Sequence, residues 1–237
     1  DNFLPRLDAL KSLIRPNTKL LALTNPNNPT GALMNAAQLG QIVEIIRPSG
    51  AYILCDEVYR GTEQSGDMGS AIVDLYDKGI STAGMSKAFS LAGLRLGWIA
   101  AAEDIIAQVM IHRDYDTISV GMIDDHFATM ALENRDRVLA RSRRITSGNL
   151  ALLEAWIEQE PLISWVKPKS GTTALLKYDL AMSSEQLCVE LLKETGVMFT
   201  PGSALNMEGY IRIGYANTPD ILKEGLARVS KFLSQRA

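Results

Sequence analysis

The sequence predicts an α/β fold with a parallel sheet, followed by a smaller α+β part. Two observations predict the sheet: short apolar runs end in turn residues or acids, and an amphipathic segment separates the first two runs. A third observation concerns the region after Pro161, where short strand patterns alternate with helical ones. We therefore expect a large domain over residues 1–140, and a connecting helix with a small domain over residues 141–237.

The first predicted unit is a strand, a helix and a second strand. Residues 19–24 are an apolar run that ends in a turn-forming segment rich in Asn and Pro. Asn35 can cap a helix over residues 36–47, in which aliphatic side chains share one face. Residues 51–55 form the next apolar run. This order predicts a right-handed βαβ unit in a parallel sheet.

The remaining elements follow from the same patterns. Strands over residues 79–83 and 97–101 flank a segment that contains a lysine. Helices are predicted over residues 103–113, 121–132 and 135–160, and after Pro161 we expect strands over 164–166, 172–178, 197–200 and 210–215, with helices over 184–195 and 219–235.

The composition excludes several classes of protein. The 237 residues include 24 Lys+Arg and 27 Asp+Glu, a formal net charge of −3, which argues against a nucleic-acid partner. No apolar run approaches the roughly 20 residues that cross a bilayer, so we expect no membrane partner. The two cysteines, Cys55 and Cys188, lie far apart in apolar stretches. Two cysteines so far apart do not indicate a network of disulfide bonds, and they suit a reducing cytoplasm.

The acidic segment around His126 does not predict a metal site. Asp124, Asp125 and His126 are adjacent on a predicted helix, so their side chains point in different directions and cannot converge on one ion. Acids near the positive end of a helix dipole explain this segment without a ligand. We therefore expect no metal.

A set of polar residues, in a definite order, carries the chemistry. Each has a structural explanation alone; Asn28 suits a turn, and a lone lysine such as Lys87 is more often solvated than catalytic. The order of these residues along the chain favours a catalytic role over the separate structural ones. Asp56 ends a buried parallel strand, where open α/β sheets bind ligands, and Tyr59 follows three residues later. The whole set consists of Asn28, Asp56, Tyr59, Ser86, Lys87, Arg95 and Arg212.

This set resembles the fold-type I pyridoxal-phosphate enzymes and, more narrowly, the class I/II aminotransferase family. The resemblance covers essentially the whole chain from Lys19 onward, and it implies a large domain with a mixed, mainly parallel sheet. It is carried by Asn28-Pro29-Thr30-Gly31, by Asp56 with Tyr59, by Ser86-Lys87 followed by Gly93-x-Arg95-x-Gly97-Trp98, and by Arg212 before Ile213-Gly214-Tyr215.

The resemblance implies pyridoxal 5′-phosphate as the cofactor, with Lys87, Asp56 and Tyr59 as catalytic residues. Lys87 would hold the cofactor as a Schiff base and shuttle a proton, which suits an amine whose pKa is lowered by desolvation near a cation. Asp56 would lie against the pyridine nitrogen and keep it protonated, because opposite charge favours the ionised carboxylate. Asn28 and Tyr59 would hydrogen-bond the phenolate oxygen of the ring.

The resemblance also assigns the anion-binding residues. Arg95, assisted by Ser86, would bind the cofactor phosphate. Arg212, beside Asn28, would bind the substrate α-carboxylate with its two-pronged guanidinium. One position departs from the family, which usually has a hydroxyl residue three positions before the lysine. Here that position is Gly84, so one phosphate contact is in doubt.

The implied activity is transfer of an amino group from an L-amino acid to a 2-oxo acid, in amino acid metabolism or biosynthesis. The family further implies a homodimer that shares residues between active sites. Two alternatives remain open. One is another reaction on the same cofactor, such as a C–S β-lyase, a decarboxylase or an aminocyclopropane-carboxylate-synthase-like reaction. The other is a non-catalytic regulatory domain of this fold, although the lysine and the aspartate are intact.

Parts of the family pattern have no counterpart in this sequence. The family's Gly-rich phosphate-binding turn, and an aromatic residue that stacks on the ring, come well before the Asn-Pro-Thr-Gly segment. Nothing before Lys19 can serve as either. We therefore expect this chain to be the C-terminal portion of a longer aminotransferase.

Overall fold

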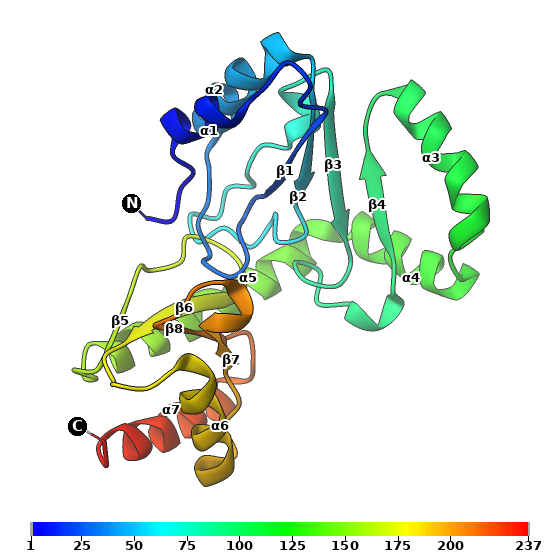
Figure 1. Cartoon of the computed structure of the whole chain (residues 1–237). Coiled ribbons are helices and arrows are strands. Elements are labelled where there is room, and N and C mark those ends of the chain that lie inside the picture. Colours follow the sequence, from blue (N-terminus) through cyan, green and yellow to red (C-terminus); the bar gives the residue numbers. More distant parts are fainter. Residues whose placement is uncertain (1, 237) are drawn as a thin grey trace.

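Two four-stranded sheets organise the chain in a computed structural model, which describes residues 2–236 (Figure 1). The helices and strands are, in chain order, α1 (Leu7–Leu13), β1 (Leu20–Thr24), α2 (Ala36–Ile46), β2 (Tyr52–Asp56), β3 (Gly79–Gly84), β4 (Gly97–Ala100), α3 (Glu103–Asp116), α4 (Met122–Glu133), α5 (Arg135–Ile157), β5 (Ile163–Trp165), β6 (Thr173–Tyr178), α6 (Ser184–Thr195), β7 (Thr200–Pro201), β8 (Tyr210–Gly214) and α7 (Pro219–Leu233).

The first sheet has the order β1-β2-β3-β4 and is mixed but mainly parallel. β2 pairs in parallel with both β1 and β3, whereas β4 runs antiparallel to β3. Asp56 lies opposite Thr24 on one side and Thr82 on the other, so three strands end at the same edge. The predicted fold class is confirmed, and Asp56 stands in the middle of the carboxyl edge where such sheets bind ligands.

The helix between β1 and β2, α2, begins after Asn35, the N-cap residue that the sequence predicts. The Asn35 side chain accepts a hydrogen bond from Gln38 N–H at 2.9 Å, and Gln38 Oε1 accepts one from Asn35 N–H at 3.0 Å, which completes a capping box. The face that α2 buries contacts Ile53 and Cys55 of β2, and it consists of Leu39, Ile42, Val43 and Ile46. Burial of this stripe fixes the helix against the sheet.

The second sheet is antiparallel, with the order β5-β6-β8-β7. Helices α5, α6 and α7 share its core, in which Leu153, Leu176 and Leu226 are buried. The buried face of α7 includes every residue that its helical spacing predicts, namely Leu222, Leu226, Val229 and Leu233.

Helix α5 has its two ends in different cores. Near its start, Leu139 is buried in a cluster with Met85 and Ala88 of the first part. Further along, Leu150 and Leu153 are buried in the core of the second sheet. No helix in the described part of the chain has both the length and the apolar character that a bilayer span requires.

Two sequence expectations fail at the level of elements. The strand expected over residues 197–200 is wrong: pairing begins only at Thr200, opposite Arg212. Gly196 ends α6 in the left-handed conformation, and Val197 N–H donates to Thr195 Oγ1 at 3.1 Å, so this backbone serves the helix end rather than a strand. In addition, α1 was not expected, and it has neither a side-chain cap nor a buried residue.

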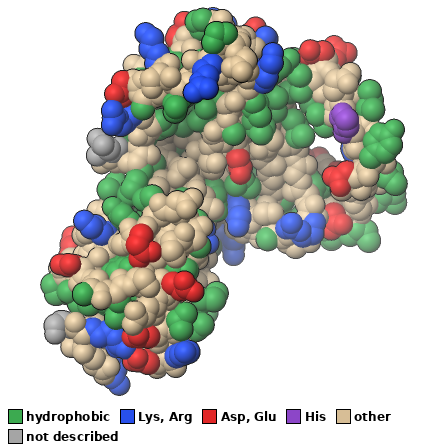
Figure 2. Space-filling model, in the orientation of Figure 1, with side chains coloured by type: hydrophobic (Ala, Val, Ile, Leu, Met, Phe, Trp, Pro, Cys, Tyr) green, Lys and Arg blue, Asp and Glu red, His purple; other side chains and the backbone are tan. Residues whose placement is uncertain are grey.

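The segment after β4 is thinly packed. α3 has no buried residue, and α4 buries only Ala128 and Ala131. In Figure 1, α3 lies beyond β4 at the outer side of the first sheet, and Figure 2 shows hydrophobic side chains along it. The exposed hydrophobic residues of this segment, here called the α3–α4 apolar surface, are Met110, Ile111, Tyr115, Ile118, Val120, Met122, Ile123, Phe127, Met130 and Leu132.

Candidate active site

The candidate site begins at the carboxyl edge of the first sheet. Asp56 is exposed there, and its Oδ1 accepts a hydrogen bond from Val58 N–H at 3.0 Å. Three residues on, Tyr59 is almost fully buried, at 3% exposure. The intervening chain is a tight turn, because Arg60 N–H donates to the Glu57 carbonyl at 2.8 Å. The turn thus places Tyr59 directly after the strand end that carries Asp56.

Lys87 reaches the same place from β3. Its Nζ lies 6.0 Å from the centroid of the Tyr59 ring. Lys87 itself is exposed, and a cavity of about 440 Å³ opens beside it. Ser86, Thr62 and Thr172 contribute hydroxyl groups to the lining of this cavity. The structure therefore brings Lys87, Tyr59 and Ser86 together as predicted neighbours.

The second sheet contributes Arg212 to the site. Arg212 Nη1 donates to Asn28 Oδ1 at 3.3 Å, and Nη2 donates to Thr200 Oγ1 at 3.1 Å. Asn28 belongs to the loop after β1, so residues 184 positions apart meet here. Thr200 was not among the predicted site residues. It is the residue directly opposite Arg212 in the pairing of β7 with β8.

Arg95 differs from the other predicted residues. It is exposed, its backbone is left-handed with φ of 49°, and its Nη1 donates to Ala92 O of its own turn at 3.1 Å. Within residues 2–236 its side chain makes no hydrogen bond to another predicted site residue. Binding of the cofactor phosphate by Arg95 and Ser86 thus stays a prediction.

The departure at Gly84 has a steric explanation. A Cβ atom added there would lie 3.1 Å from Leu96 O and 3.3 Å from Gly97 Cα. At Gly97 an added Cβ atom would lie 2.7 Å from Ala83 O. The backbones of β3 and β4 therefore approach each other closely at this point, and a hydroxyl residue in place of Gly84 would have to move the neighbouring strand.

A buried network joins the turn that holds Tyr59 to the second sheet. Thr62 Oγ1 accepts a hydrogen bond from Gly171 N–H at 2.9 Å and lies 3.1 Å from Ser170 Oγ. The Tyr215 hydroxyl donates to the Gly171 carbonyl at 2.8 Å. Thr62, Ser170 and Tyr215 are each no more than 1% exposed. Thr62 and Ser170 were not predicted from the sequence, because isolated hydroxyl side chains give no periodic signal.

Buried ionisable groups lie beneath the carboxyl edge. Burial, and then the charge of Glu57, raise the pKa of Cys55 to about 12, so its thiol stays protonated and is not a nucleophile. Burial also raises the pKa of Glu57, against the hydrogen bonds from Ile72 N–H and Ser81 that favour its charged form.

The predicted charged residues of the site form no ion pairs in the described part of the chain. Among residues 2–236, no ion pair within 4.0 Å involves Asp56, Lys87, Arg95 or Arg212. Arg212 is bound by neutral oxygens instead. The Asp56 carboxylate can pair with a protonated ring nitrogen, the two arginines can bind a phosphate and a carboxylate, and the Lys87 amine can bond to an aldehyde. The residues present therefore fit pyridoxal 5′-phosphate and an amino acid.

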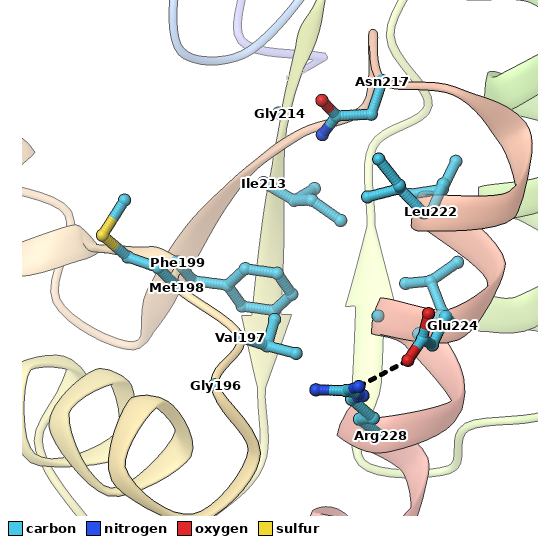
Figure 3. Close-up of a pocket in the computed structure, with 13 residues that line it drawn as sticks. Gly196, Val197, Met198, Phe199, Ile213, Gly214, Asn217, Leu222, Glu224 and Arg228 are labelled. Atoms are coloured by element: carbon cyan, nitrogen blue, oxygen red, sulfur yellow. Dashed lines mark hydrogen bonds and ion pairs between the residues drawn. The ribbon is translucent and has the colours of Figure 1, made fainter.

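A separate pocket lies in the second part of the chain, between the end of α6 and helix α7 (Figure 3). Its volume is about 320 Å³, and apolar side chains such as Val197, Phe199 and Leu222 point into it. Its two charged residues, Glu224 and Arg228, form an ion pair with each other. None of the predicted site residues lines this pocket.

Comparison with known proteins decides the family. The family model described as aminotransferase class I and II matches residues 1–229. The chain belongs to this aminotransferase family. Membership confirms the resemblance that the motifs carry, and with it the predicted cofactor, because class I and II aminotransferases depend on pyridoxal 5′-phosphate.

Structures and sequences of similar proteins agree with this assignment. A pyridoxal-phosphate-dependent aminotransferase from Streptococcus suis superposes with a TM-score of 0.96 and 42% identity, over 100% of this chain and 63% of that one. Aromatic-amino-acid aminotransferase 2 from Thermococcus litoralis is 30% identical, over 97% of this chain and 61% of its own length. Capreomycidine synthase from Streptomyces vinaceus is 28% identical, over 100% of this chain and 61% of its own length. The chain thus spans less than two thirds of these relatives.

Proposed function

We propose that this chain forms the Lys87-containing part of an aminotransferase that moves an amino group from an L-amino acid to a 2-oxo acid. One observation carries the proposal: Asp56 and Lys87 near the carboxyl edge of the first sheet, and Arg212, which reaches Asn28 from the second sheet, form no ion pair within the described residues. Charged side chains of both signs that are left unpaired beside a cavity are candidates for binding a charged ligand.

Each residue then has a task that its position supports. When bound, the cofactor supplies an electron sink for the substrate Cα. Lys87 holds the cofactor and moves a proton at that carbon, and Asp56 keeps the ring nitrogen protonated. Arg212 orients the substrate through its α-carboxylate. The other contacts, to the ring oxygen and to the phosphate, fall to Asn28, Tyr59, Ser86 and Arg95.

The test is to locate the attachment point. The purified chain is incubated with pyridoxal 5′-phosphate, reduced with borohydride and digested, and mass spectrometry identifies the modified lysine. We expect the adduct on Lys87, and we expect Lys87→Ala to lose the adduct and the absorbance of the bound cofactor while keeping its circular dichroism. An adduct on another lysine, or an unchanged absorbance in Lys87→Ala, would contradict the proposal.

A second candidate is a different reaction on the same cofactor. Capreomycidine synthase, whose name is not that of an aminotransferase, matches the whole of this chain. The two candidates differ in what an amino acid does to the loaded protein. Amino transfer converts the bound cofactor to its amine form, and its absorbance changes without loss of the amino acid's other groups. Release of a fragment of the amino acid instead would favour the second candidate.

We further propose two domains, residues 1–140 and 141–237, and a homodimer. The separate cores at the two ends of α5, around Leu139 and around Leu153, support the boundary. The α3–α4 apolar surface supports a partner subunit, because exposed apolar patches of this kind mark interaction sites. Light scattering on the purified protein tests the dimer; a monomer at micromolar concentration would contradict it.

We propose a cytoplasmic location and a role in amino acid metabolism, including biosynthesis. Two free, buried cysteines, Cys55 and Cys188, support a reducing compartment. The metabolic role follows from the proposed substrates. Cell fractionation with an antibody to the chain tests the location, and a membrane-associated signal would contradict it.

A further inference from the structure

Two acidic residues in succession, Asp56 and Glu57, have opposite surroundings. Asp56 is exposed at the carboxyl edge, whereas Glu57 is 3% exposed. Glu57 continues the alternation of β2, in which Ile53 and Cys55 are fully buried on the same side. The carboxylate of Glu57 therefore lies in the interior, directly behind the residue that faces the cofactor.

Glu57 is tied to two neighbouring segments. Its Oε1 accepts hydrogen bonds from Ile72 N–H and from the Ser81 hydroxyl, each at 2.8 Å. Ser81 Oγ in turn accepts one from Val73 N–H at 3.2 Å. The backbone N–H of Glu57 donates to Thr82 O at 2.7 Å. The side chain thus fastens the end of β2 to β3 and to the 3₁₀ helix at Ile72–Asp74.

The site residues on either side of Glu57 have less support of their own. The Asp56 carboxylate is held by a single hydrogen bond, from Val58 N–H. The turn that carries Tyr59 begins at Glu57, since the Glu57 carbonyl accepts the hydrogen bond that closes it. A shift of residue 57 would therefore move Asp56 and Tyr59 together.

We propose that Glu57 is a positioning residue, which aims Asp56 and Tyr59 at the cofactor by anchoring the first residue of their turn. The proposal rests on the proposed function, in which these two side chains contact the cofactor ring. Residues that lock the groups around a site set its geometry, and small displacements are costly there.

The hydrogen bonds, rather than the charge of Glu57, carry this role. Both donors meet the same oxygen, so the amide oxygen of a glutamine can accept both. The charged groups that act on this carboxyl are Arg60 and Asp74, and neither forms an ion pair with it. Glu57→Gln should therefore keep the geometry, whereas Glu57→Ala removes it.

Glu63 provides a matched control in the same loop. It is 1% exposed and also accepts two backbone hydrogen bonds, from Gly61 at 2.8 Å and from Gly69 at 3.1 Å. Glu63→Ala therefore removes a buried carboxylate with the same number of hydrogen bonds. Its partners do not include β3 or the turn at Asp56.

The first measurement needs no cofactor. The amide resonance of Val58 reports the hydrogen bond to Asp56, and it is followed by NMR in the full chain. We expect Glu57→Ala to lose the downfield shift of this amide and to exchange its proton about tenfold faster, as local opening becomes easier. Glu57→Gln and Glu63→Ala should leave it close to the unsubstituted protein. An unchanged Val58 resonance in Glu57→Ala would overturn the proposal.

The second measurement is titration with pyridoxal 5′-phosphate, followed by absorbance over a range of pH. We expect Glu57→Ala to bind about tenfold more weakly, the cost of one charged hydrogen bond, and to shift the pH midpoint of the absorbance. Glu57→Gln should restore both. Equal losses in Glu57→Ala and Glu63→Ala would reduce Glu57 to a stability role and overturn the proposal. If the unsubstituted chain forms no Lys87 adduct, the proposed function fails, while the Val58 resonance still decides the role of Glu57.

Discussion

The second sheet and the α3–α4 segment are built in opposite ways. In the second sheet three helices share one core, and residues such as Leu176 and Tyr215 are fully buried. In the α3–α4 segment, α3 buries nothing, and residues such as Met122 and Tyr115 are more than four-fifths exposed. The first region is stabilised by its own side chains. The second leaves its apolar side chains exposed among the described residues.

The contrast extends to the two anion-binding arginines. Arg212 projects from the well-packed sheet and is held by Asn28 and Thr200, from two different segments. Arg95 lies on the thinly packed side, next to β4, and within residues 2–236 its side chain is held only by Ala92 of its own turn. The arginine that we propose for the substrate carboxylate is therefore held by other segments of this chain, whereas the one that we propose for the phosphate is not.

The largest expected difference between the two regions is in stability. Leu176→Ala should lower the free energy of unfolding by about 2–5 kcal/mol, because the side chain is 0% exposed at the centre of its core. Ile111→Ala, at 54% exposure on α3, should change it by less than about 0.5 kcal/mol. Urea denaturation followed by circular dichroism measures both. Similar losses in the two variants would mean that α3 is packed as tightly as the second sheet.

For self-association, substitutions on the α3–α4 apolar surface should have the larger effect and substitutions in the second part of the chain the smaller one. Replacing Met122 and Ile123 by serine removes two of the most exposed side chains of the α3–α4 apolar surface, and we expect it to weaken self-association at least about tenfold. The matched control replaces Met198 and Ile221, which are also exposed but border the pocket of Figure 3. Concentration-dependent light scattering measures both. If only the control variant associated more weakly, the interface would lie at that pocket and not at the α3–α4 apolar surface.

The smallest expected effect is a difference in pH dependence. Burial raises the pKa of Glu57 above its ordinary value of 4.5, so ionising this carboxyl costs stability as the pH rises past that value. Hydrogen bonds from Ser184 lower the pKa of Glu208, so its stabilising effect is present above pH 4.5 and is lost as the pH falls through its lowered value.

The two glutamine variants should therefore drift in opposite directions. From about pH 4 to pH 7, Glu57→Gln should gain stability relative to the unsubstituted protein, and Glu208→Gln should lose it. Urea denaturation at several pH values gives the two differences. Parallel slopes would contradict the assignment of raised and lowered pKa values to the two carboxyls.

The sequence predicted what depends on local pattern. The helix cap at Asn35, the buried face of α7 and the position of Asp56 at a strand end follow from local sequence alone, and the structure confirms them. The strand at Thr200 was predicted at the wrong residues. Two paired residues are too few to show an alternating pattern, and Thr200 pairs with Arg212, which belongs to a distant segment.

The supporting residues of the site were harder to predict. Glu57 has a signal that was available, since it stands two residues after the buried Cys55 on the same strand face. Thr62 and Ser170 have none, because 108 residues separate two hydroxyls that meet only in the folded chain. The isolated surroundings of Arg95 could not be foreseen either, as they depend on the packing of β4 and α3.

Helix α5 has a mechanical consequence. The helix is anchored by Leu139 in the first core and by Leu153 in the second. Unfolding of either core would therefore release one half of a helix whose other half is still packed. A displacement of the second sheet, which carries Arg212, would therefore act through α5 and Leu139 on Met85 and Ala88, the buried residues before and after the Ser86-Lys87 pair.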